Sequence, residues 1–395
     1  MKQLHVINLE KMGGVERLFL QHIHTPSDDK HVIMCFSDKI GTEIQDQMPC
    51  HYHRIQFANR LFTHIPLRCP KFLRKYWIFW KISRISSDII IIWNFMVELP
   101  AKPKKTTLLY YDHGSSWRFT TKKKVTRFFS MLDGVIAASF ASKRMMELRF
   151  NLPCHHLVVL NRIQTPPGIN KIQKSLHKPV RLGTASRLVD IKGITVSLLT
   201  VHELILRGHH VTIEIAGKGR YKKQLEILTK KLKLGDRVIF SGFQKETSSF
   251  FNRIDIYMST PLTEPFGLSC LEALYYGIPI IFPLIDGQPE VISNGISGIG
   301  LHPKVSIKNH ENLIGMSIDF PHDVYDPITD TLVPPKFLSH IECANTVETL
   351  TIPSIYNQFS YNAKKYTLTQ LNYNVFQENF KKTLLFFKKN HDTTL

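Results

Sequence analysis

The fold of this chain is decided by residues 254–283, which read IDIYMSTPLTEPFGLSCLEALYYGIPIIFP. The runs Ile254–Ser259 and Ile278–Pro283 are apolar and of strand length, and they predict two buried β-strands. Between them, Leu268–Tyr276 repeats apolar residues with a helical period, and Gly277, with a proline two residues later, is typical of a helix end. A strand, a loop, a helix and a second strand in this order indicate two parallel strands joined by a crossover helix.

The same alternation extends over most of the chain in both directions. Further strands are predicted at His5–Leu9, His31–Phe36, Asp88–Trp93, Thr107–Tyr111, Gly134–Ala138, Leu157–Leu160, Val180–Thr184, His210–Ala216 and Arg237–Ser241. Further helices are predicted at Val15–His24, Val125–Leu132, Ala141–Phe150, Gly193–Arg207 and Lys222–Leu232. A chain of 395 residues is long for one core, because single cores rarely grow past about 250–300 residues. We therefore expect an α/β fold of two Rossmann-like, doubly wound domains facing across a cleft, with ligands at the carboxyl ends of the strands.

Domain limits follow from the places where this alternation stops. Thr165-Pro-Pro-Gly168 cannot continue a helix or a strand, and it marks a boundary. The predicted parts are an N-terminal domain at 1–165, a linker at 166–178, a C-terminal domain at 179–370 with an irregular insertion at 303–353, and a C-terminal helix at 371–395. We expect that last helix to pack back on the N-terminal domain.

The composition argues against several classes of protein. Six scattered cysteines form no CxxC pair and no Cys/His cluster with zinc spacing, so we expect neither a disulfide framework nor a structural zinc. The sequence contains no run of about 18 uncharged apolar residues that could span a bilayer. Because the N-terminus lacks the apolar core of a signal peptide, a cytoplasmic location is expected.

Positive charge is concentrated in the N-terminal third. The net charge is +19, and His51–Arg84 holds eight Lys or Arg residues and no Asp or Glu. Such an excess favours nucleic acid, an anionic membrane surface or a phosphorylated substrate, but no recognition element for nucleic acid accompanies it. The basic and aromatic stretch Arg60–Arg84 is either a core-facing helix with a solvated basic side or a surface that rests on anionic lipid. In the second case Phe72, Trp77 and Trp80 would lie at the interface, and the protein would be peripheral on the inner face of the cytoplasmic membrane.

The chemistry of the chain centres on two carboxylates eight residues apart, Glu264 and Glu272. A pair of this kind taken alone is more often a solvated helix face. Here Glu264 falls in a loop, while Glu272 falls one turn inside the helix that follows. The first N–H groups of that helix, expected from Ser269, Cys270 and Leu271, suit a diphosphate because they lack partners within the helix and share its dipole. Glu272 could then accept hydrogen bonds from a ribose, and Glu264 could reach a sugar beyond the phosphate.

The segment Glu264-Pro-Phe-Gly-Leu…Glu272-Ala-Leu-Tyr-Tyr-Gly-Ile-Pro resembles the Glu-x7-Glu signature of the retaining glycosyltransferase family 4, which has the GT-B fold. Other segments resemble that family as well: Gly13–Arg17, Asp112–Gly114, Gly183–Gly193, Ala216–Gly219, Val238–Phe243 and Asp286–Gly298. The resemblance is weak over Leu4–Asn161 and strong over Val180–Leu301, and it lapses at about 51–105 and after 302. Ser186 departs from the pattern, because the family more often has glycine there.

The resemblance implies a metal-independent enzyme whose C-terminal domain binds a nucleoside-diphosphate sugar and whose N-terminal domain binds the acceptor. The residues placed in catalysis are His113, Arg187, Lys192 and Glu264. The residues placed around the donor are Gly13, Gly14, Gly217, Phe243, Phe266, Gly267, Leu268, Ser269, Cys270, Leu271 and Glu272, with Glu290 nearby. Arg187 and Lys192 would neutralise the departing diphosphate in place of a metal, and no Asp-x-Asp triad occurs in the sequence. Glu264 would bind the sugar's hydroxyls, and His113 would lie beside the sugar, near its C6 hydroxyl or the acceptor.

These implications set the expected substrates. We expect no metal and no cofactor, a UDP-sugar ahead of a GDP-sugar as donor, and a glycan or lipid-linked acceptor such as a lipopolysaccharide or capsule precursor. The alternatives are an inverting GT-B transferase, or a basic nucleic-acid- or membrane-binding protein without catalysis. The sequence leaves open whether retention uses same-face attack or a covalent intermediate.

Overall fold

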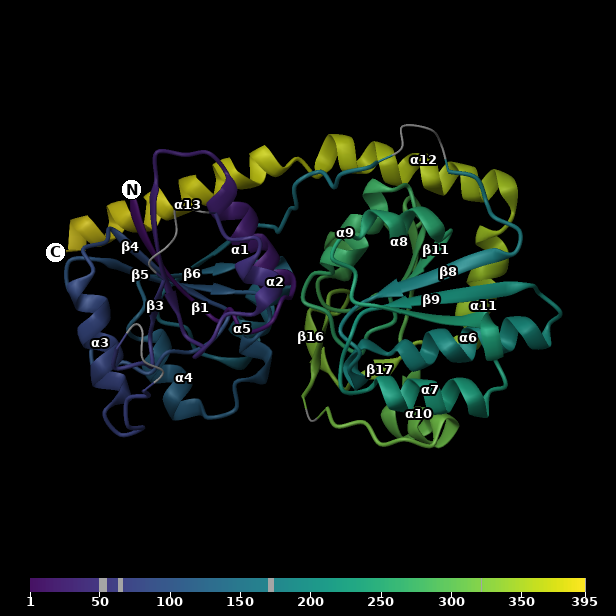
Figure 1. The fold of residues 1–395 in the computed structure, drawn as a ribbon, viewed down its shortest axis with the longest axis horizontal. Helices are drawn as coiled ribbons and strands as arrows, with labels where there is room; N and C mark the ends of the chain where they lie inside the picture. Colours follow the sequence, from purple (N-terminus) through teal and green to yellow (C-terminus); the bar gives the residue numbers. More distant parts are fainter. Residues whose placement is uncertain (50–54, 63–66, 170–173, 321, 395) are drawn as a thin grey trace. The chain divides into compact units, whose positions relative to one another are not determined.

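Two compact units make up the protein, one built mainly from residues 1–161 and the other from residues 162–373 (Figure 1). The chain after residue 373 returns to the first unit. The computed structural model describes residues 1–49, 55–62, 67–169, 174–320 and 322–394. Each unit has one large parallel β-sheet covered by helices. The predicted fold class, two doubly wound α/β domains, is thus confirmed.

The first unit contains a seven-stranded sheet with the order β3-β2-β1-β4-β5-β6-β7, and every neighbouring pair is parallel. Its strands are β1 (Lys2–Ile7), β2 (Lys30–Cys35), β3 (Gln56–Phe57), β4 (Ile89–Trp93), β5 (Thr107–Asp112), β6 (Gly134–Ala137) and β7 (His155–Val158). Its helices are α1 (Gly14–His24), α2 (Thr42–Gln45), α3 (Arg74–Arg84), α4 (Lys122–Phe129), α5 (Phe140–Arg149) and α13 (Tyr373–Thr394), with a 3-10 turn at Ser116–Arg118. The order of the strands reverses between β1 and β4, the point at which doubly wound sheets commonly bind ligands.

Opposite faces of the first sheet pack on different helices. Ile92 of β4 lies in a buried cluster with Ile78 of α3 and Phe128 of α4. Trp93, the next residue of the same strand, contacts Phe19 of α1 with 5.4 Å between ring centroids. The strand reads IIIIW and is buried along its whole length, as expected for a central parallel strand covered on both sides.

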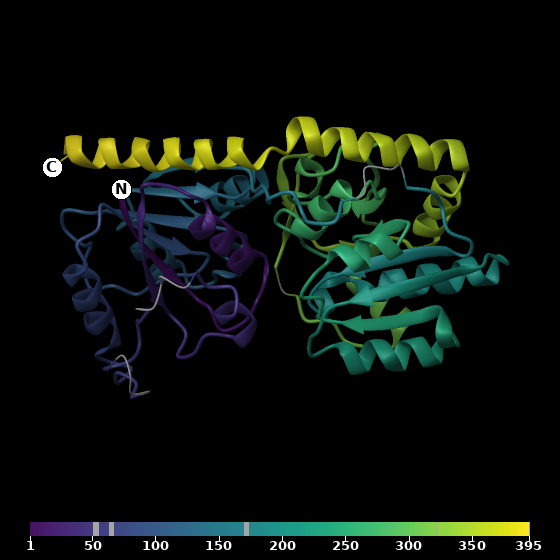
Figure 2. The same ribbon diagram turned by 45° about the horizontal axis from the view of Figure 1, so that its top comes forward.

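The C-terminal helix α13 packs beside α1 in this first unit (Figure 2). Phe380 of α13 contacts His22 of α1, with 5.0 Å between ring centroids. The ring of Phe387 fills the space next to Gly134 of β6, where an added Cβ would lie 2.0 Å from it. The last helix therefore completes the helical layer over one face of the first sheet.

The second unit contains a six-stranded parallel sheet with the order β10-β9-β8-β11-β12-β13. Its strands are β8 (Val180–Ala185), β9 (Val211–Ala216), β10 (Val238–Gly242), β11 (Ile256–Met258), β12 (Ile280–Pro283) and β13 (Gly298–Leu301). The helices that connect them are α6 (Ile194–Leu206), α7 (Lys222–Lys231), α8 (Ser248–Arg253) and α9 (Leu268–Tyr275), and the long helix α12 (Pro353–Gln370) packs against α9. The 3-10 turns are Asp190–Lys192, Gly235–Arg237 and Gln288–Glu290. Here the order of the strands reverses between β8 and β11.

The segment 303–353, expected to be an irregular insertion, holds regular structure instead. Its elements are β14 (Val305–Ser306), α10 (Ile307–Ile314), β15 (Val324–Asp326), β16 (Thr331–Val333), β17 (Lys336–Phe337) and α11 (His340–Leu350). β14 pairs with β17 and β15 pairs with β16, both antiparallel, and α11 packs on α6. The sequence did not reveal these elements because strands of two or three residues are too short to show a period of hydrophobic residues.

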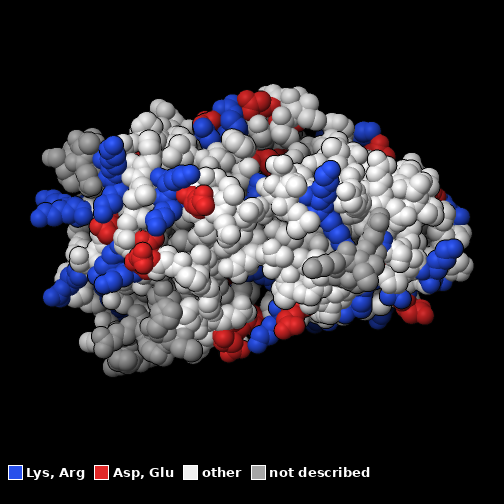
Figure 3. Space-filling view, turned by 90° about the horizontal axis from the view of Figure 1, so that it is seen from above, with Lys and Arg blue, Asp and Glu red and all other residues white. Residues whose placement is uncertain are grey.

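The surface of the first unit carries the positive charge that the sequence places in its N-terminal third. On the face drawn in Figure 3, Lys and Arg side chains predominate over Asp and Glu at the end of this unit. None of the helices in the described part of the chain is both long and apolar enough to cross a lipid bilayer.

Candidate active site

The loops that carry the predicted catalytic residues of the second unit follow neighbouring strands. Since β8 and β11 pair directly, the loops that follow them leave the sheet side by side at its carboxyl edge. The backbone N–H of Leu262, in the second loop, donates to the carbonyl oxygen of Ile191, in the first, at 2.8 Å. The two loops are therefore joined through their backbones.

A lysine and a glutamate from these two loops form an ion pair. Lys192 Nζ lies 2.5 Å from Glu264 Oε2, and the two side chains are only 17% and 19% exposed. The residues are 72 positions apart in the sequence, so only the fold brings them together. A partly buried ion pair is screened less by water than one on an open surface, and each partner fixes the direction of the other.

A glycine is required directly after Lys192. Gly193 has a φ of 58°, and a Cβ added to it would lie 1.9 Å from the carbonyl oxygen of Thr260. A side chain there would therefore strain the backbone and collide with the loop after β11. The tight approach at Gly193 is what holds Lys192 beside that loop.

The first turn of α9 presents two backbone N–H groups that the helix does not use. Gly267, the residue before the helix, has a φ of 101°, and its carbonyl oxygen accepts from both Cys270 N and Leu271 N at 3.0 and 3.1 Å. We expected Cys270 and Leu271 to offer free N–H groups, and the structure shows that this expectation was wrong. The N–H groups of Leu268 and Ser269 have no acceptor among the described residues, and they point along the positive end of the helix dipole.

Several residues placed around the donor are buried and could contribute only their backbones. Phe266, Cys270 and Leu271 are 3%, 1% and 0% exposed. Glu272 is 7% exposed, and its Oε1 accepts a hydrogen bond from Thr247 Oγ1 at 3.1 Å. The Glu272 carboxylate is therefore anchored between α9 and the residue preceding α8.

Asp286, which sequence reasoning did not assign a role, organises the loop that carries Glu264. Its Oδ2 accepts from Glu264 N at 2.9 Å and from Thr263 Oγ1 at 2.8 Å, while Oδ1 accepts from Tyr325 N at 2.9 Å. Asp286 is fully buried and has a φ of 51°. The sequence placed Asp286 at the start of a segment that resembles the glycosyltransferase family, just before the 3-10 turn that contains Glu290, but it gave no sign of these contacts.

We expect Asp286 to give the protein a pH-dependent stability of unusual sign. Burial, opposed by its hydrogen bonds, raises the pKa of this carboxyl from 3.8 to about 7. Between these two values the folded state binds the proton more tightly than the unfolded state, so the free energy of unfolding contributed by Asp286 falls as the pH rises. Urea unfolding of the protein and of Asp286→Asn at about pH 5 and about pH 8 measures this, since taking the difference cancels groups common to both. Wild type should lose stability relative to the variant as the pH rises, and parallel profiles would contradict the assignment.

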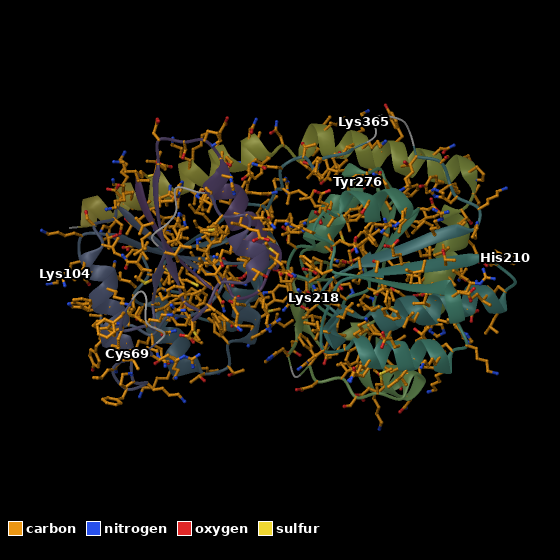
Figure 4. The ribbon with its side chains drawn as sticks, in the orientation of Figure 1. Cys69, Lys104, His210, Lys218, Tyr276 and Lys365 are labelled. Atoms are coloured by element: carbon orange, nitrogen blue, oxygen red, sulfur yellow. The ribbon has the colours of Figure 1, made fainter. Side chains whose placement is uncertain are left out.

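The remaining candidates of the second unit lie on the loops after β8, β9 and β10. Arg187 is exposed, and its guanidinium forms no hydrogen bond or ion pair with the described residues. Gly217 has a φ of 134°, and a Cβ there would lie 1.9 Å from the carbonyl oxygen of Ser186. Lys218, at the carboxyl end of β9, places its Nζ 4.8 Å from the centre of the Phe243 ring (Figure 4). A guanidinium, an ammonium and an exposed aromatic face thus border the same edge of the sheet.

In the first unit, His113 follows β5 in a turn that two side chains hold in place. Asp112 Oδ1 and Oδ2 accept from Ser116 N and Gly114 N, both at 3.1 Å. Asn94, which follows β4 with a φ of 60°, accepts through Oδ1 from His113 N at 2.8 Å. Neither Asp112 nor Asn94 was assigned this role from the sequence.

The His113 ring is held neutral. Burial lowers its pKa to about 3. Its Nδ1 lies 3.3 Å from the Asn161 amide nitrogen, and the ring stacks on Trp93 with 5.9 Å between centroids. A neutral, oriented imidazole can exchange hydrogen bonds with a ligand but carries no charge near neutral pH.

The glycines of the first loop are placed at the start of α1. Gly13 precedes the helix in an extended conformation, and Gly14 is its first residue. A Cβ on Gly13 would meet only the carboxylate of Glu16, at 2.8 Å. A ligand could therefore approach the backbone at Gly13. The backbone of Gly13 is extended and not left-handed, so its conformation does not require glycine.

Three histidines that sequence reasoning missed gather in the core of the first unit. Ring nitrogens of His5, His22 and His31 all lie within 4.8 Å of one another, a spacing that could hold a metal ion. However, Trp93 Nε1, which can only donate, lies 3.1 Å from His5 Nδ1, so the proton of His5 sits on Nε2 and faces His31 Nδ1 at 2.9 Å. Burial lowers the pKa of His22 to about 4. This group fits a chain of neutral, hydrogen-bonded imidazoles better than a set of metal ligands.

Two doubly wound, parallel-sheet domains in one chain constitute the GT-B fold of glycosyltransferases. Residues 169–315 match the family model described as Glycosyl transferases group 1. This range covers β8 to α10 and contains Lys192, Glu264 and Glu272. The match to this family model therefore falls within the second unit.

Known relatives match parts of the sequence, and solved structures match the whole fold. The O-antigen biosynthesis glycosyltransferase WclY of Escherichia coli is 34% identical over 99 residues, 25% of this chain and 27% of that protein. An uncharacterized glycosyltransferase of Methanocaldococcus jannaschii is 32% identical over 120 residues, 30% of each chain. The matched stretch thus spans less than a third of the length of either relative. The crystal structure of HepE from Anabaena in complex with UDP-glucose covers 97% of this chain and 99% of that chain, with a TM-score of 0.70 and 17% identity.

Proposed function

We propose that this protein is a retaining, metal-independent glycosyltransferase that moves a sugar from a nucleoside-diphosphate sugar to a glycan acceptor. The observation that carries the proposal is the Lys192–Glu264 pair at the carboxyl edge of the second sheet. Glu264 lies in the loop that leads into α9, where two N–H groups have no acceptor among the residues that the structure describes. A cation and helix N–H groups suit a diphosphate, and a carboxylate suits sugar hydroxyls.

The chemistry of transfer assigns each of these groups a part. As the bond from the sugar to phosphate breaks, negative charge grows on the diphosphate and positive charge grows on the anomeric carbon. Lys192, Arg187 and the N–H groups of Leu268 and Ser269 stabilise the first charge, which is the task a divalent metal performs elsewhere. Glu264 accepts hydrogen bonds from the sugar and keeps Lys192 aligned, and Glu272 is proposed to bind the ribose. His113 takes part as a neutral hydrogen-bonding group, because its pKa of about 3 excludes a cation near neutral pH.

The proposed substrates rest on the relatives. UDP is preferred over GDP, since the HepE structure of the same fold was solved with UDP-glucose. A lipopolysaccharide or capsule precursor is the proposed acceptor, since one relative is described as acting in O-antigen biosynthesis and another, from Erwinia amylovora, in amylovoran biosynthesis. Gly13 and Gly14 leave the backbone of the first loop open to a phosphate or to this acceptor.

Donor binding is expected to stabilise the protein in the presence of excess EDTA. Thermal unfolding with UDP, GDP and CDP should show the largest rise in Tm with UDP, worth about 2.7 kcal/mol at a concentration about 100 times Kd. Arg187→Ala should lose most of this rise, while Arg181→Ala, at the amino end of β8, should keep it. A rise that disappears with EDTA would contradict metal independence, and no rise with any nucleotide would contradict the donor site.

The stereochemistry of transfer separates the retaining from the inverting mechanism. We expect the anomeric configuration of the donor sugar to be preserved in the product, as read by NMR of the new glycosidic linkage. A product of opposite configuration would replace this proposal with an inverting GT-B transferase.

A further inference from the structure

The outer face of α3 exposes a row of large apolar side chains. Phe72, Leu73, Tyr76 and Trp80 are 76%, 46%, 53% and 45% exposed, and we call these four residues the α3 row. Residues at this spacing lie along one side of a helix and the turn that leads into it. The opposite side of α3 is buried through Ile78 and Ile82. A soluble surface seldom exposes so many large apolar side chains together without a use for them.

The segment that carries the α3 row is basic. Residues 67–87 contain six Lys or Arg and no Asp or Glu. The guanidinium of Arg84 lies 4.7 Å from the centre of the Trp80 ring, and Lys75 Nζ lies 5.0 Å from that of Tyr76. Lys104, which precedes β5, lies at the same end of the first unit (Figure 4). A partner that covers the row must therefore combine an apolar interior with a negative surface.

Trp77, which we expected at a membrane interface, supports Trp80 from the inner side of α3 instead. Its indole N–H donates to the carbonyl oxygen of Arg60 at 2.9 Å, and its ring stacks on Trp80 with 4.8 Å between centroids. Lys81 also turns inward and donates to Phe57 O at 2.7 Å. These inner contacts make the base on which Trp80 rests, so the row is presented by a fixed scaffold.

We infer that the α3 row docks the protein on an anionic phospholipid bilayer. Aromatic and leucine side chains enter the boundary between headgroups and acyl chains, while Lys71, Lys75 and Arg84 remain at the level of the phosphates. An acidic protein surface would satisfy the cations, but it offers no apolar layer along the whole row. The inference stands whether or not the proposed transfer is correct, and it would bring a lipid-linked acceptor to the enzyme.

Vesicle sedimentation without any nucleotide sugar tests this docking. Wild type should sediment with vesicles of phosphatidylcholine and phosphatidylglycerol at moderate salt, and not with pure phosphatidylcholine. Phe72→Ser/Trp80→Ser and Lys71→Glu/Lys75→Glu should each lower binding by at least about tenfold. The matched controls are Leu206→Ser/Ile227→Ser, which are 69% and 63% exposed on the second unit, and Lys223→Glu/Lys230→Glu on α7. Both controls should bind as wild type does.

Tryptophan fluorescence separates insertion from charge attraction alone. Of the four tryptophans, Trp93 and Trp117 are 2% and 4% exposed, and Trp77 is held beneath Trp80 by its hydrogen bond to Arg60 O, so Trp80 should dominate any change of emission on binding. Emission should shift to the blue with anionic vesicles, and Trp80→Phe should bind with little shift. Failure of wild type to bind these vesicles, equal loss of binding in the controls, or equal binding of wild type to duplex DNA would overturn the inference.

Discussion

Lys192→Ala is expected to lower sugar transfer by about 10²–10³-fold in kcat, the usual cost of removing one group that stabilises charge in the transition state. Lys192 lies in the 3-10 turn after β8 and its side chain is only 17% exposed. In the alanine variant, water molecules would therefore make up poorly for the missing ammonium group. The change also leaves the Glu264 carboxylate, 19% exposed, without its cation. Glu264→Gln should be similarly damaging, because the neutral amide can accept a hydrogen bond from Lys192 but forms no ion pair with it.

The contact between Lys192 and Glu264 also predicts that their substitutions are not additive. Lys192 and Glu264 touch, so the double variant should lose less than the product of the two single losses. Lys223→Ala, an exposed lysine on α7, serves as the matched control and should leave kcat and Tm unchanged. Transfer by Lys192→Ala at near wild-type kcat would remove this residue from the mechanism.

Gly287→Ala is expected to destabilise the second unit by about 3 kcal/mol and to abolish transfer. A Cβ at Gly287 would lie 1.9 Å from the carbonyl oxygen of Pro265. The atoms that it would meet belong to the backbone of Pro265 and Phe266, so no side chain can rotate away to relieve the collision. Gly287 N also donates to Glu264 O at 3.2 Å, hence relief of the collision must move the Glu264 loop. Alanine can adopt the backbone conformation of Gly287, whose φ is −89°. The expected loss of stability therefore comes from the steric collision of the Cβ and not from backbone strain.

A second glycine provides the control for this steric argument. Gly13→Ala meets only the carboxylate end of Glu16, a flexible side chain, and should change the free energy of unfolding by less than about 1 kcal/mol. Urea unfolding of both variants measures the contrast. Equal stability of Gly287→Ala and wild type would mean that the Glu264 loop is looser than its contacts indicate.

The sequence was sufficient to predict most strands of the two sheets. Parallel strands are buried on both faces, so runs such as IIIIW in β4 are recognised directly. The bounds of α9 follow from Gly267 and Gly277, two glycines with positive φ at its ends. The approach of Lys192 to Glu264 was not predicted, because it depends on the direct pairing of β8 with β11.

Other features depend on tertiary contacts that no local pattern encodes. In the first turn of α9, Cys270 N and Leu271 N both donate to the Gly267 carbonyl oxygen, so of the three N–H groups expected to be free only that of Ser269 has no acceptor among the described residues. Asp286 acts through contacts with Glu264 and Tyr325, which are 22 and 39 residues away. The inward turn of Trp77 depends on a carbonyl 17 residues earlier. Each of these is decided by packing between elements, after the elements themselves have formed.

Crystals of the protein grown with UDP offer the most direct test of how the second unit holds its donor. We predict diphosphate oxygens within hydrogen-bonding distance of Leu268 N and Ser269 N, with Lys192 Nζ and Arg187 turned toward them. Electron density for the diphosphate at any other edge of the sheet, with the first turn of α9 in contact with solvent or protein alone, would contradict the account.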